Sequence, residues 1–130
     1  MKSEPRWISQ KALLLLHEES LAMFGGARGI RDRGLFDSAL ARAQNSHAYN
    51  SDFTLAELAA AYSFGLAGNH PFVDGNKRAA FLSIGLFLAI NGYRLSVDPV
   101  DAIRHMLGLA SGELTEQELA AWINANMEKL

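Results

Sequence analysis

The chain has 130 residues, no cysteine, 49% hydrophobic residues and a formal net charge of -2. This length fits one domain with its own core, so we expect residues 1–130 to form a single domain. The absence of cysteine excludes a disulfide framework, a thiolate zinc site and a cysteine nucleophile, and it suits a reducing compartment. Twelve basic residues against fourteen acidic ones create no overall positive field, so direct nucleic-acid binding is not expected.

The apolar stretches are too short for a membrane span or a secretion signal. The longest runs from Ala79 to Ile90, below the roughly 20 residues that cross a bilayer. Near the N-terminus, the stretch from Ala12 to Leu16 falls short of the roughly 7–15 apolar residues of a signal peptide. We therefore expect a cytoplasmic protein that does not contact a membrane.

The first part of the chain predicts two helices. Ser9 is a suitable N-cap for a helix that runs to about Met23 and stops at the glycine pair 25–26. A second helix is predicted from about residue 34 to residue 44, with apolar residues on one side and Asp32 as its candidate cap.

A polar stretch and an apolar helix follow. Residues 45–53 lack a helical apolar face, which indicates an exposed loop or a short hairpin. Thr54 and Glu57 then have the spacing of a capping box. They open an alanine-rich helix that ends at residues 68–69, and its apolar character on most faces predicts a central position in the fold.

The second half of the chain also has a helical period. A helix is predicted from residue 76 or 77 to Ile90, followed by a briefly extended segment at residues 94–97. Asp98 is the predicted N-cap of a helix that runs to about Ala110, and residues 115–118 form a second capping box for the last helix. These elements predict an all-α domain of about six helices, with two apolar helices at its centre.

A polar segment, His70 to Arg78, separates these two apolar helices, and we call it the motif segment. Its turn at residues 74–76 leads directly into a helix, whose first backbone N–H groups have no intrahelical partner. Together with the positive end of the helix dipole, these groups predict an anion site. Lys77 and Arg78 lie in the first turn, where the dipole disfavours cations unless an anion is bound.

The motif segment also contains the groups that phosphoryl or nucleotidyl transfer requires. Asp74 can hold a divalent cation that bridges phosphates, and His70 has the position of a base for an incoming hydroxyl. Gly75 allows close approach of a ligand, and Phe72 is expected to point into the core. Taken singly, the polar residues also fit ordinary roles as turn, cap or surface residues. The P-loop pattern is absent.

The motif segment resembles the signature of the Fic/Doc family, His-Pro-Phe-x-Asp/Glu-Gly-Asn-Gly/Lys-Arg, and residues 25–32 and 38–42 resemble its death-on-curing (Doc) branch. The similarity covers essentially the whole chain and implies the all-α Fic fold. AMP-transferring members have Gly after the Asn and a second Arg three residues after the first. This chain has Lys77 and Phe81 there, as in the Doc branch, whose members use ATP as a phosphate donor.

The resemblance implies the toxin of a type II toxin–antitoxin system, which phosphorylates a hydroxyl on a protein such as elongation factor Tu and so stops translation. It implies that His70 is the general base and that Asp74 holds Mg²⁺. The residues implied to bind the phosphates of ATP are Gly75, Asn76, Lys77 and Arg78. The alternatives are a Fic-type AMP transferase and a catalytically silent binding module with the same fold.

Regulation is expected from a second protein. Many Fic proteins carry a self-inhibitory helix with Glu four residues after Ser or Thr, and no Ser or Thr of this chain has Glu at that spacing. The resemblance therefore implies a separate antitoxin that places a short amphipathic helix in a groove. The family's target-docking flap maps only loosely onto residues 45–53, to which we assign no role.

The other histidines and the tryptophans receive structural interpretations. His17 precedes two glutamates, which favours a solvated helix face. His47 and Tyr49 fall in the predicted loop, where an ordinary loop is favoured over a contact with the target. The residues interpreted as structural or packing residues are His105, Trp7 and Trp122.

Overall fold

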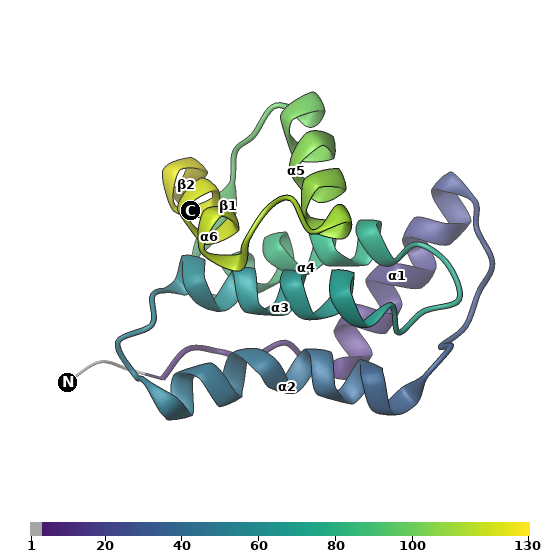
Figure 1. Ribbon diagram of the computed structural model, residues 1–130, viewed down its shortest axis with the longest axis horizontal. Coiled ribbons are helices and arrows are strands. Elements are labelled where there is room, and N and C mark those ends of the chain that lie inside the picture. The colour runs from purple at the N-terminus through teal and green to yellow at the C-terminus, as the bar shows by residue number, and fades with distance from the viewer. Residues whose placement is uncertain (1–3) are drawn as a thin grey trace.

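The computed structural model describes residues 4–130, which form six helices and a two-stranded sheet (Figure 1). This confirms the prediction of an all-α domain of about six helices. None of the helices in the described range is long and apolar enough to cross a bilayer. The elements are α1 (Gln10–Phe24), α2 (Arg33–Tyr49), α3 (Leu55–Asn69), α4 (Asn76–Ile90), β1 (Tyr93–Leu95), α5 (Pro99–Ser111), α6 (Glu116–Asn126) and β2 (Met127–Lys129).

Side-chain caps determine where most of the helices begin. Thr54 and Thr115 each accept a hydrogen bond from the backbone within a complete capping box, as predicted. The other capped helices start at Ser9, Asp32 and Asp98. Of the helices in residues 4–130, only α4 starts without a side-chain cap, because its N-cap is Gly75.

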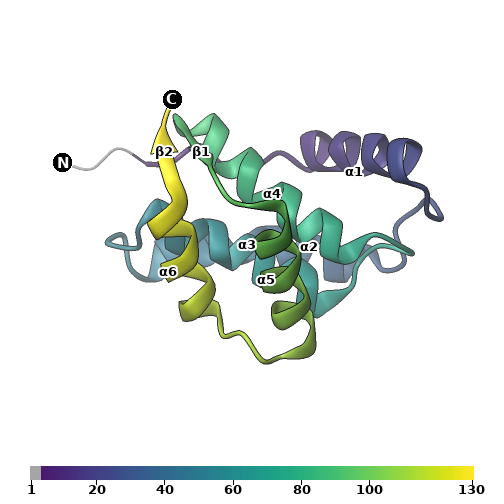
Figure 2. The same ribbon diagram turned by 90° about the horizontal axis from the view of Figure 1, so that it is seen from above.

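The central element is α3, as its apolar composition predicts (Figures 1 and 2). It packs against α2, α4 and α6. Its Tyr62 is buried, and the hydroxyl accepts a hydrogen bond from the N–H of Ile8 (3.1 Å). On the other side of the core, α4 packs against both α1 and α5 (Figure 2). The connection between the two apolar helices α3 and α4 therefore lies near the end of α1.

The predicted loop over residues 45–53 is wrong in its first half, because α2 continues to Tyr49. The ring of His47 lies edge-on against Trp7, with 5.4 Å between the ring centroids. Trp7 also stacks on Phe87 of α4 (6.1 Å). The apolar surface that covers the last turn of α2 thus comes from the N-terminal segment, so the local periodicity of residues 45–49 could not reveal it.

The predicted extended segment is the strand β1, which pairs antiparallel with β2. Tyr93 lies opposite Lys129, and Arg94 donates two hydrogen bonds to the carboxylate of Glu128 (3.0 and 2.8 Å). The strand β2 was not predicted, since three residues are too few to show an alternating pattern. The pairing ties residues 127–129 to the connection between α4 and α5.

Candidate functional site

The loop between α3 and α4, residues 70–75, is paired with the connection between α1 and α2. Ile30 and Phe72 form an isolated antiparallel bridge, and the N–H of Val73 donates to the carbonyl of Gly29 (3.0 Å). Phe72 is fully buried, as the sequence predicts. These contacts fix the backbone of the loop that carries the polar residues of the motif segment.

The segment beside the motif is therefore residues 25–32, and residues 45–53 lie elsewhere. The latter precede α3, whereas the motif follows it. Since α3 has 15 residues, its two ends are about 22 Å apart. The loose mapping of a target-docking flap onto residues 45–53 thus does not agree with the fold, because that stretch is too distant to cover His70.

His70 ends α3 in the left-handed conformation (φ 48°), and it is the only residue other than glycine with a positive φ in the described range. Such a conformation is uncommon for a residue with a Cβ. Arg31 holds it in place, because its Nε donates to the carbonyl of His70 (2.8 Å) and its Nη2 to that of Asn69 (3.0 Å). The ring of His70 is exposed and lines a groove, where a substrate hydroxyl can reach it.

The side chain of Asn76 closes the loop from within. Its Oδ1 accepts from the N–H of Phe72 (2.9 Å), and its Nδ2 donates to the carbonyl of the same residue (3.0 Å). The amide oxygen is thus occupied by the backbone of the loop. A contribution of Asn76 to anion binding would come from its backbone N–H at the start of α4.

The carboxylate of Asp74 is fixed by backbone donors. Its Oδ2 accepts from the N–H of Ala27 (3.2 Å) and its Oδ1 from the N–H of Gly75 (2.8 Å). These two hydrogen bonds lower the pKa of Asp74 below its ordinary value, and the nearby charge of Arg78 adds to the effect. Asp74 is therefore ionised at neutral pH and exposed to the groove.

The surroundings of Asp74 fit magnesium better than zinc. Residues 4–130 contain no group of three or more His, Cys, Asp or Glu side chains that could hold a metal ion. A cation at Asp74 would have one protein carboxylate and would take its other ligands from water or a bound phosphate. Magnesium binds in this way at nucleotide sites.

Positive charge gathers beside Asp74. Lys77 is exposed at the start of α4, where the backbone N–H groups have no side-chain cap. Arg78 donates from Nη1 to the carbonyl of Gly25 (3.2 Å), with a longer contact to that of Ser20 (3.5 Å), and its guanidinium lies 5.5 Å from the ring of Phe24. This arrangement can bind an anion.

The helices α1, α4 and α5 enclose a groove of about 1150 Å³ that opens onto the motif segment. Away from the motif, the lining of the groove is mostly apolar, with Glu19 and Ser20 of α1 as polar members. Phe24 at the end of α1 is 68% exposed and Ile103 on α5 is 61% exposed, although both are large hydrophobic residues. Other apolar side chains of its lining are Leu16, Met23, Phe81, Leu82, Met106 and Leu107.

His17 lies beneath the motif segment, so the prediction of a solvated helix face is wrong. It is 3% exposed and belongs to the buried face of α1 together with Leu13 and Leu21. The spacing of four residues between these positions was the available signal, and the following glutamates obscured it. Arg31 and the N–H of Ala27 were also missed as site groups, because their partners lie 39 and 47 residues away in the sequence.

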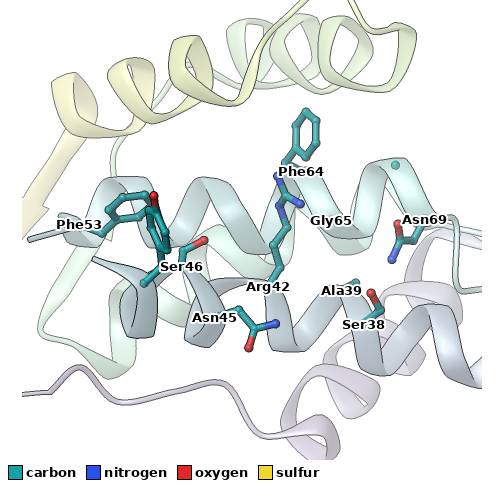
Figure 3. A pocket seen from close by; sticks show the side chains of 11 residues that line it. Ser38, Ala39, Arg42, Asn45, Ser46, Phe53, Phe64, Gly65 and Asn69 are labelled. Carbon is teal, nitrogen blue, oxygen red and sulfur yellow. The ribbon is translucent and has the colours of Figure 1, made fainter. Parts of the chain in front are cut away.

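A smaller pocket of about 430 Å³ lies between α2 and α3 (Figure 3). Arg42 extends from α2 toward Phe64 on α3, with its guanidinium carbon 4.8 Å from the ring centroid. The same guanidinium is ion-paired with Glu116 of α6. The charge in this pocket is therefore already neutralised, and the arrangement joins three helices.

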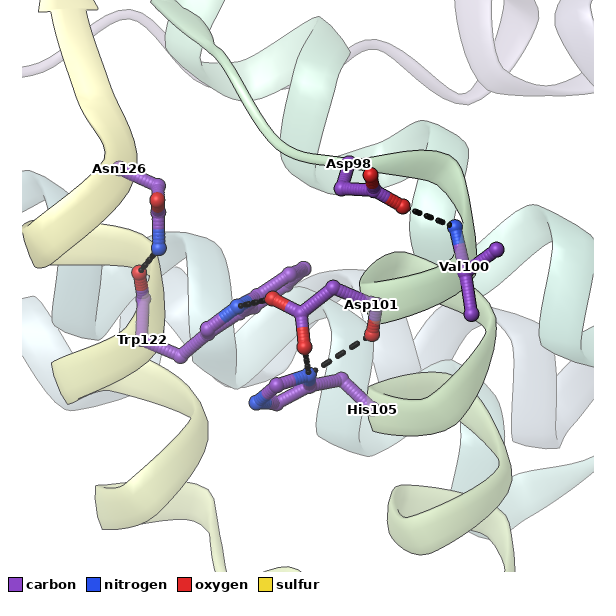
Figure 4. A network of polar contacts seen from close by, with 6 residues as sticks. All are labelled: Asp98, Val100, Asp101, His105, Trp122 and Asn126. Atoms are coloured by element: carbon purple, nitrogen blue, oxygen red, sulfur yellow. Dashed lines mark hydrogen bonds and ion pairs between the residues drawn. The ribbon is translucent and has the colours of Figure 1, made fainter.

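His105 and Trp122 are packing residues, as predicted (Figure 4). Their rings stack with centroids 4.1 Å apart. Asp101 accepts a hydrogen bond from Nε1 of Trp122 (2.8 Å), and its carboxylate lies 3.3 Å from Nδ1 of His105. This network fixes the face of α5 opposite the groove against α6.

Comparisons with known proteins identify the family of this chain. The model of the Fic/DOC family matches residues 7–88, which include the motif segment. The chain is 34% identical to "Protein kinase doc" of Escherichia phage P1 over 115 residues, which cover 88% of this chain and 90% of the relative. It is 47% identical to "Toxin Doc" of Mycolicibacterium smegmatis over 77 residues, 58% of each chain. The family match and the 34% identity over nearly the full length place this chain in the Fic/DOC family.

Proposed function

We propose that this chain is the toxin of a toxin–antitoxin pair and transfers a phosphate from ATP to a hydroxyl of a protein target. One observation carries the proposal. An exposed histidine, an ionised aspartate and an uncapped helix start with two cations lie within the motif segment, at one end of a groove. The names of the two relatives, a kinase and a toxin, support it.

The residues present fit a magnesium nucleotide. Mg²⁺ supplies neutralisation of phosphate charge when bound, and Asp74 would hold it. The phosphate oxygens would accept hydrogen bonds from the backbone at Gly75 and Asn76 and from the side chains of Lys77 and Arg78. Phosphoryl transfer depends mainly on such positioning and charge stabilisation.

His70 would serve as the general base. In the proposed reaction, the hydroxyl oxygen of the target bonds to the γ-phosphorus while the bond between that phosphorus and the β–γ bridging oxygen breaks. His70 takes the proton of the hydroxyl, and ADP leaves. The exposure of its ring at the edge of the groove supports this role.

The target that we propose is elongation factor Tu, from the resemblance to the Doc branch. Phosphorylation of this factor would arrest translation, which places the activity in the cytoplasm, where ATP, Mg²⁺ and the translation machinery are available. The resemblance also favours phosphate transfer over AMP transfer. Phe81, which lines the groove one turn after Arg78, provides an apolar ring where AMP-transferring members have a second cation.

The antitoxin would bind in the groove between α1, α4 and α5. The exposed apolar side chains of Phe24, Ile103 and Leu107 suit the apolar face of a partner helix. Since Phe24 contacts Arg78, a helix in the groove would lie beside the proposed phosphate site. Occupation of the groove would therefore restrain the toxin.

The proposal is tested by expressing the chain in bacteria without a partner. The wild type should arrest growth, and His70→Ala should remove the arrest because the base is lost. His105→Ala is the matched control, since this histidine lies on α5 facing α6, outside the groove, and it should stay toxic. Equal growth arrest by the wild type and by His70→Ala would contradict a catalytic toxin.

A further inference from the structure

A buried histidine lies beneath the proposed active site, and the reaction described above does not use it. His17 of α1 is 3% exposed, within a helix whose other buried positions are Leu13, Ser20 and Leu21. A leucine would fill the same space without a polar atom to satisfy. The imidazole therefore requires an explanation beyond packing.

Both the face and the edge of the ring are in contact with the motif segment. The face stacks on Phe72, with the centroids 3.7 Å apart and the planes 14° from parallel. On the edge, Nε2 lies 2.8 Å from the carbonyl oxygen of Asp74. A carbonyl oxygen only accepts hydrogen bonds, so Nε2 must carry the proton. His17 is thus a donor whose orientation is fixed by the aromatic stack.

The hydrogen bond to Asp74 determines how the next peptide unit points. In a trans peptide the C=O and N–H groups point in opposite directions. When the carbonyl of Asp74 is directed toward His17, the N–H of Gly75 must point away from it. That N–H donates to Oδ1 of the Asp74 carboxylate (2.8 Å). One donor on α1 therefore orients both the carboxylate and the residue that begins α4.

Gly75 packs so closely against His17 and Leu21 of α1 that a side chain at this position would crowd them. Gly75 has a φ of 75°, and a Cβ at this position would lie 3.3 Å from Nε2 of His17 and 3.4 Å from Cδ2 of Leu21. The backbone at the start of α4 thus lies directly on the imidazole. A change in the ring is transmitted to the proposed phosphate site without an intervening side chain.

We propose that His17 is a positioning residue that orients the Asp74–Gly75 peptide and so holds the magnesium carboxylate and the phosphate-binding start of α4 in register. The expected effect of His17 on nucleotide binding rests on the proposed function. The orientation of the Asp74–Gly75 peptide by the Nε2–H donor does not depend on the reaction.

Two substitutions separate the donor from the ring. His17→Phe keeps an aromatic ring to stack on Phe72 but removes the donor. His17→Gln loses the stack but keeps an amide N–H that can reach the carbonyl of Asp74. The matched control is His105→Phe, since His105 is a half-buried histidine that likewise stacks on an aromatic ring (4.1 Å from Trp122) and has a backbone hydrogen bond. It lies away from the motif.

The first measurement is the dissociation constant of Mg²⁺–ATP, made below the melting temperature of every variant. His17→Phe should weaken binding by at least about fivefold, the scale of one lost hydrogen bond. His17→Gln and His105→Phe should stay within about twofold of the wild type. If His17→Phe binds as tightly as the wild type, or if both His17 variants lose affinity in proportion to their thermal stability, His17 is a packing residue only.

The second measurement is an NMR spectrum of the ¹⁵N-labelled protein without nucleotide. The ring of His17 should be the Nε2–H tautomer, and the amide resonance of Gly75 should shift in His17→Phe and return toward its wild-type position in His17→Gln. A Gly75 resonance that is unchanged in His17→Phe would overturn the inference. If the wild type binds no Mg²⁺–ATP, the proposed function fails, and the Gly75 resonance still decides the role of His17.

Discussion

Asp74 shows how the backbone determines the charge of a single side chain. Two N–H groups, those of Ala27 and Gly75, hydrogen-bond to its carboxylate and favour the ionised form. A carboxylate with a lowered pKa stays ionised when ordinary aspartates, with a pKa near about 3.9, begin to take up protons. The proposed magnesium ligand is therefore ready for a cation across the physiological pH range.

We predict that Asp74→Asn loses at least about tenfold in affinity for Mg²⁺–ATP, measured by calorimetry, because the amide carries no charge to hold the cation. ATP alone should bind both proteins alike. Asparagine keeps an oxygen acceptor for the loop, so the fold should be retained. Equal Mg²⁺–ATP affinities for Asp74→Asn and the wild type would exclude Asp74 as the metal ligand.

The carboxylate of Asp74 should also make the free energy of unfolding of the wild type, relative to Asp74→Asn, depend on pH. Since the pKa of Asp74 is lower in the folded state, its contribution is present above the unfolded value of about 3.9 and is lost as the pH falls through the lower folded value. In urea unfolding, the stability difference between the wild type and Asp74→Asn should be constant from pH 7 to about 5. It should shrink below about pH 4. A difference that grows on acidification would contradict the lowered pKa.

Arg31 positions the proposed base through two carbonyl groups at once. Its Nε and Nη2 donate to His70 and Asn69, and the single ammonium of a lysine cannot reproduce this fork. We predict that Arg31→Lys lowers the phosphotransfer rate by about tenfold or more, because small displacements of reacting groups are costly. Its affinity for Mg²⁺–ATP should hardly change. Arg33→Lys is the control, since Arg33 is exposed and pairs with Asp37 and Gln10, neither of which belongs to the motif segment.

If Arg31→Lys and Arg33→Lys transfer phosphate at the same rate, the hydrogen bonds of Arg31 do not position His70. A parallel loss of nucleotide affinity and rate in Arg31→Lys would instead indicate that the whole motif segment has moved. The crystal structure of the variant would show which carbonyl has lost its donor.

At the scale of elements, the sequence predicts the helices well where the signal is local. The capping boxes at Thr54 and Thr115 place the starts of α3 and α6 correctly, since the groups involved lie within four residues. The end of α2 and the burial of His17 could not be predicted as easily. The surfaces that cover them come from Trp7 and Phe72, which are far away in the sequence.

In the candidate site, too, the sequence predicts the residues with a local signal and misses those whose partners are distant in the sequence. The polar residues of the motif segment are evident from the sequence because they interrupt two apolar helices. The groups that orient them belong to α1 and to residues 25–32. Arg31 is 39 residues from His70, and His17 is 57 residues from Asp74. The packing of α1 against α4 and the bridge between Ile30 and Phe72 bring these partners together, so no local pattern indicates them.

The helix α5 presents two different faces. One face is fixed to α6 through Asp101, His105 and Trp122, and the other provides Ile103 and Leu107 to the groove. An exposed apolar face on a helix that is anchored from behind suits a docking surface for a partner helix. The anchoring should keep the groove open when no partner is bound.

We predict that Ile103→Asp strongly weakens binding of the antitoxin while the fold and the Mg²⁺–ATP affinity are retained. A carboxylate in an apolar interface remains unpaired when it is buried, so the dissociation constant should rise by about a hundredfold in a titration. Val100→Asp is the matched control. Val100 is equally exposed on α5 (63%) but does not line the groove. Similar affinities for the two variants would place the antitoxin elsewhere.

At the scale of the whole molecule, the proposed catalytic groups and the apolar groove form one continuous surface. The motif segment closes one end of the groove, and Arg78, in the first turn of α4 beside the proposed phosphate site, contacts the end of α1. A bound partner and a bound nucleotide would thus meet the same side chains. The molecule as a whole is suited to an activity that a second protein switches off.

The position of a label in ATP tests most directly whether the γ-phosphate is transferred to a protein. The purified chain is incubated with Mg²⁺ and a bacterial lysate, with ATP labelled either in the γ-phosphate or in the α-phosphate. We predict that a protein of the size of elongation factor Tu acquires label from γ-labelled ATP only, and that His70→Ala transfers none. Label transferred from α-labelled ATP, or equal labelling by His70→Ala, would contradict the account.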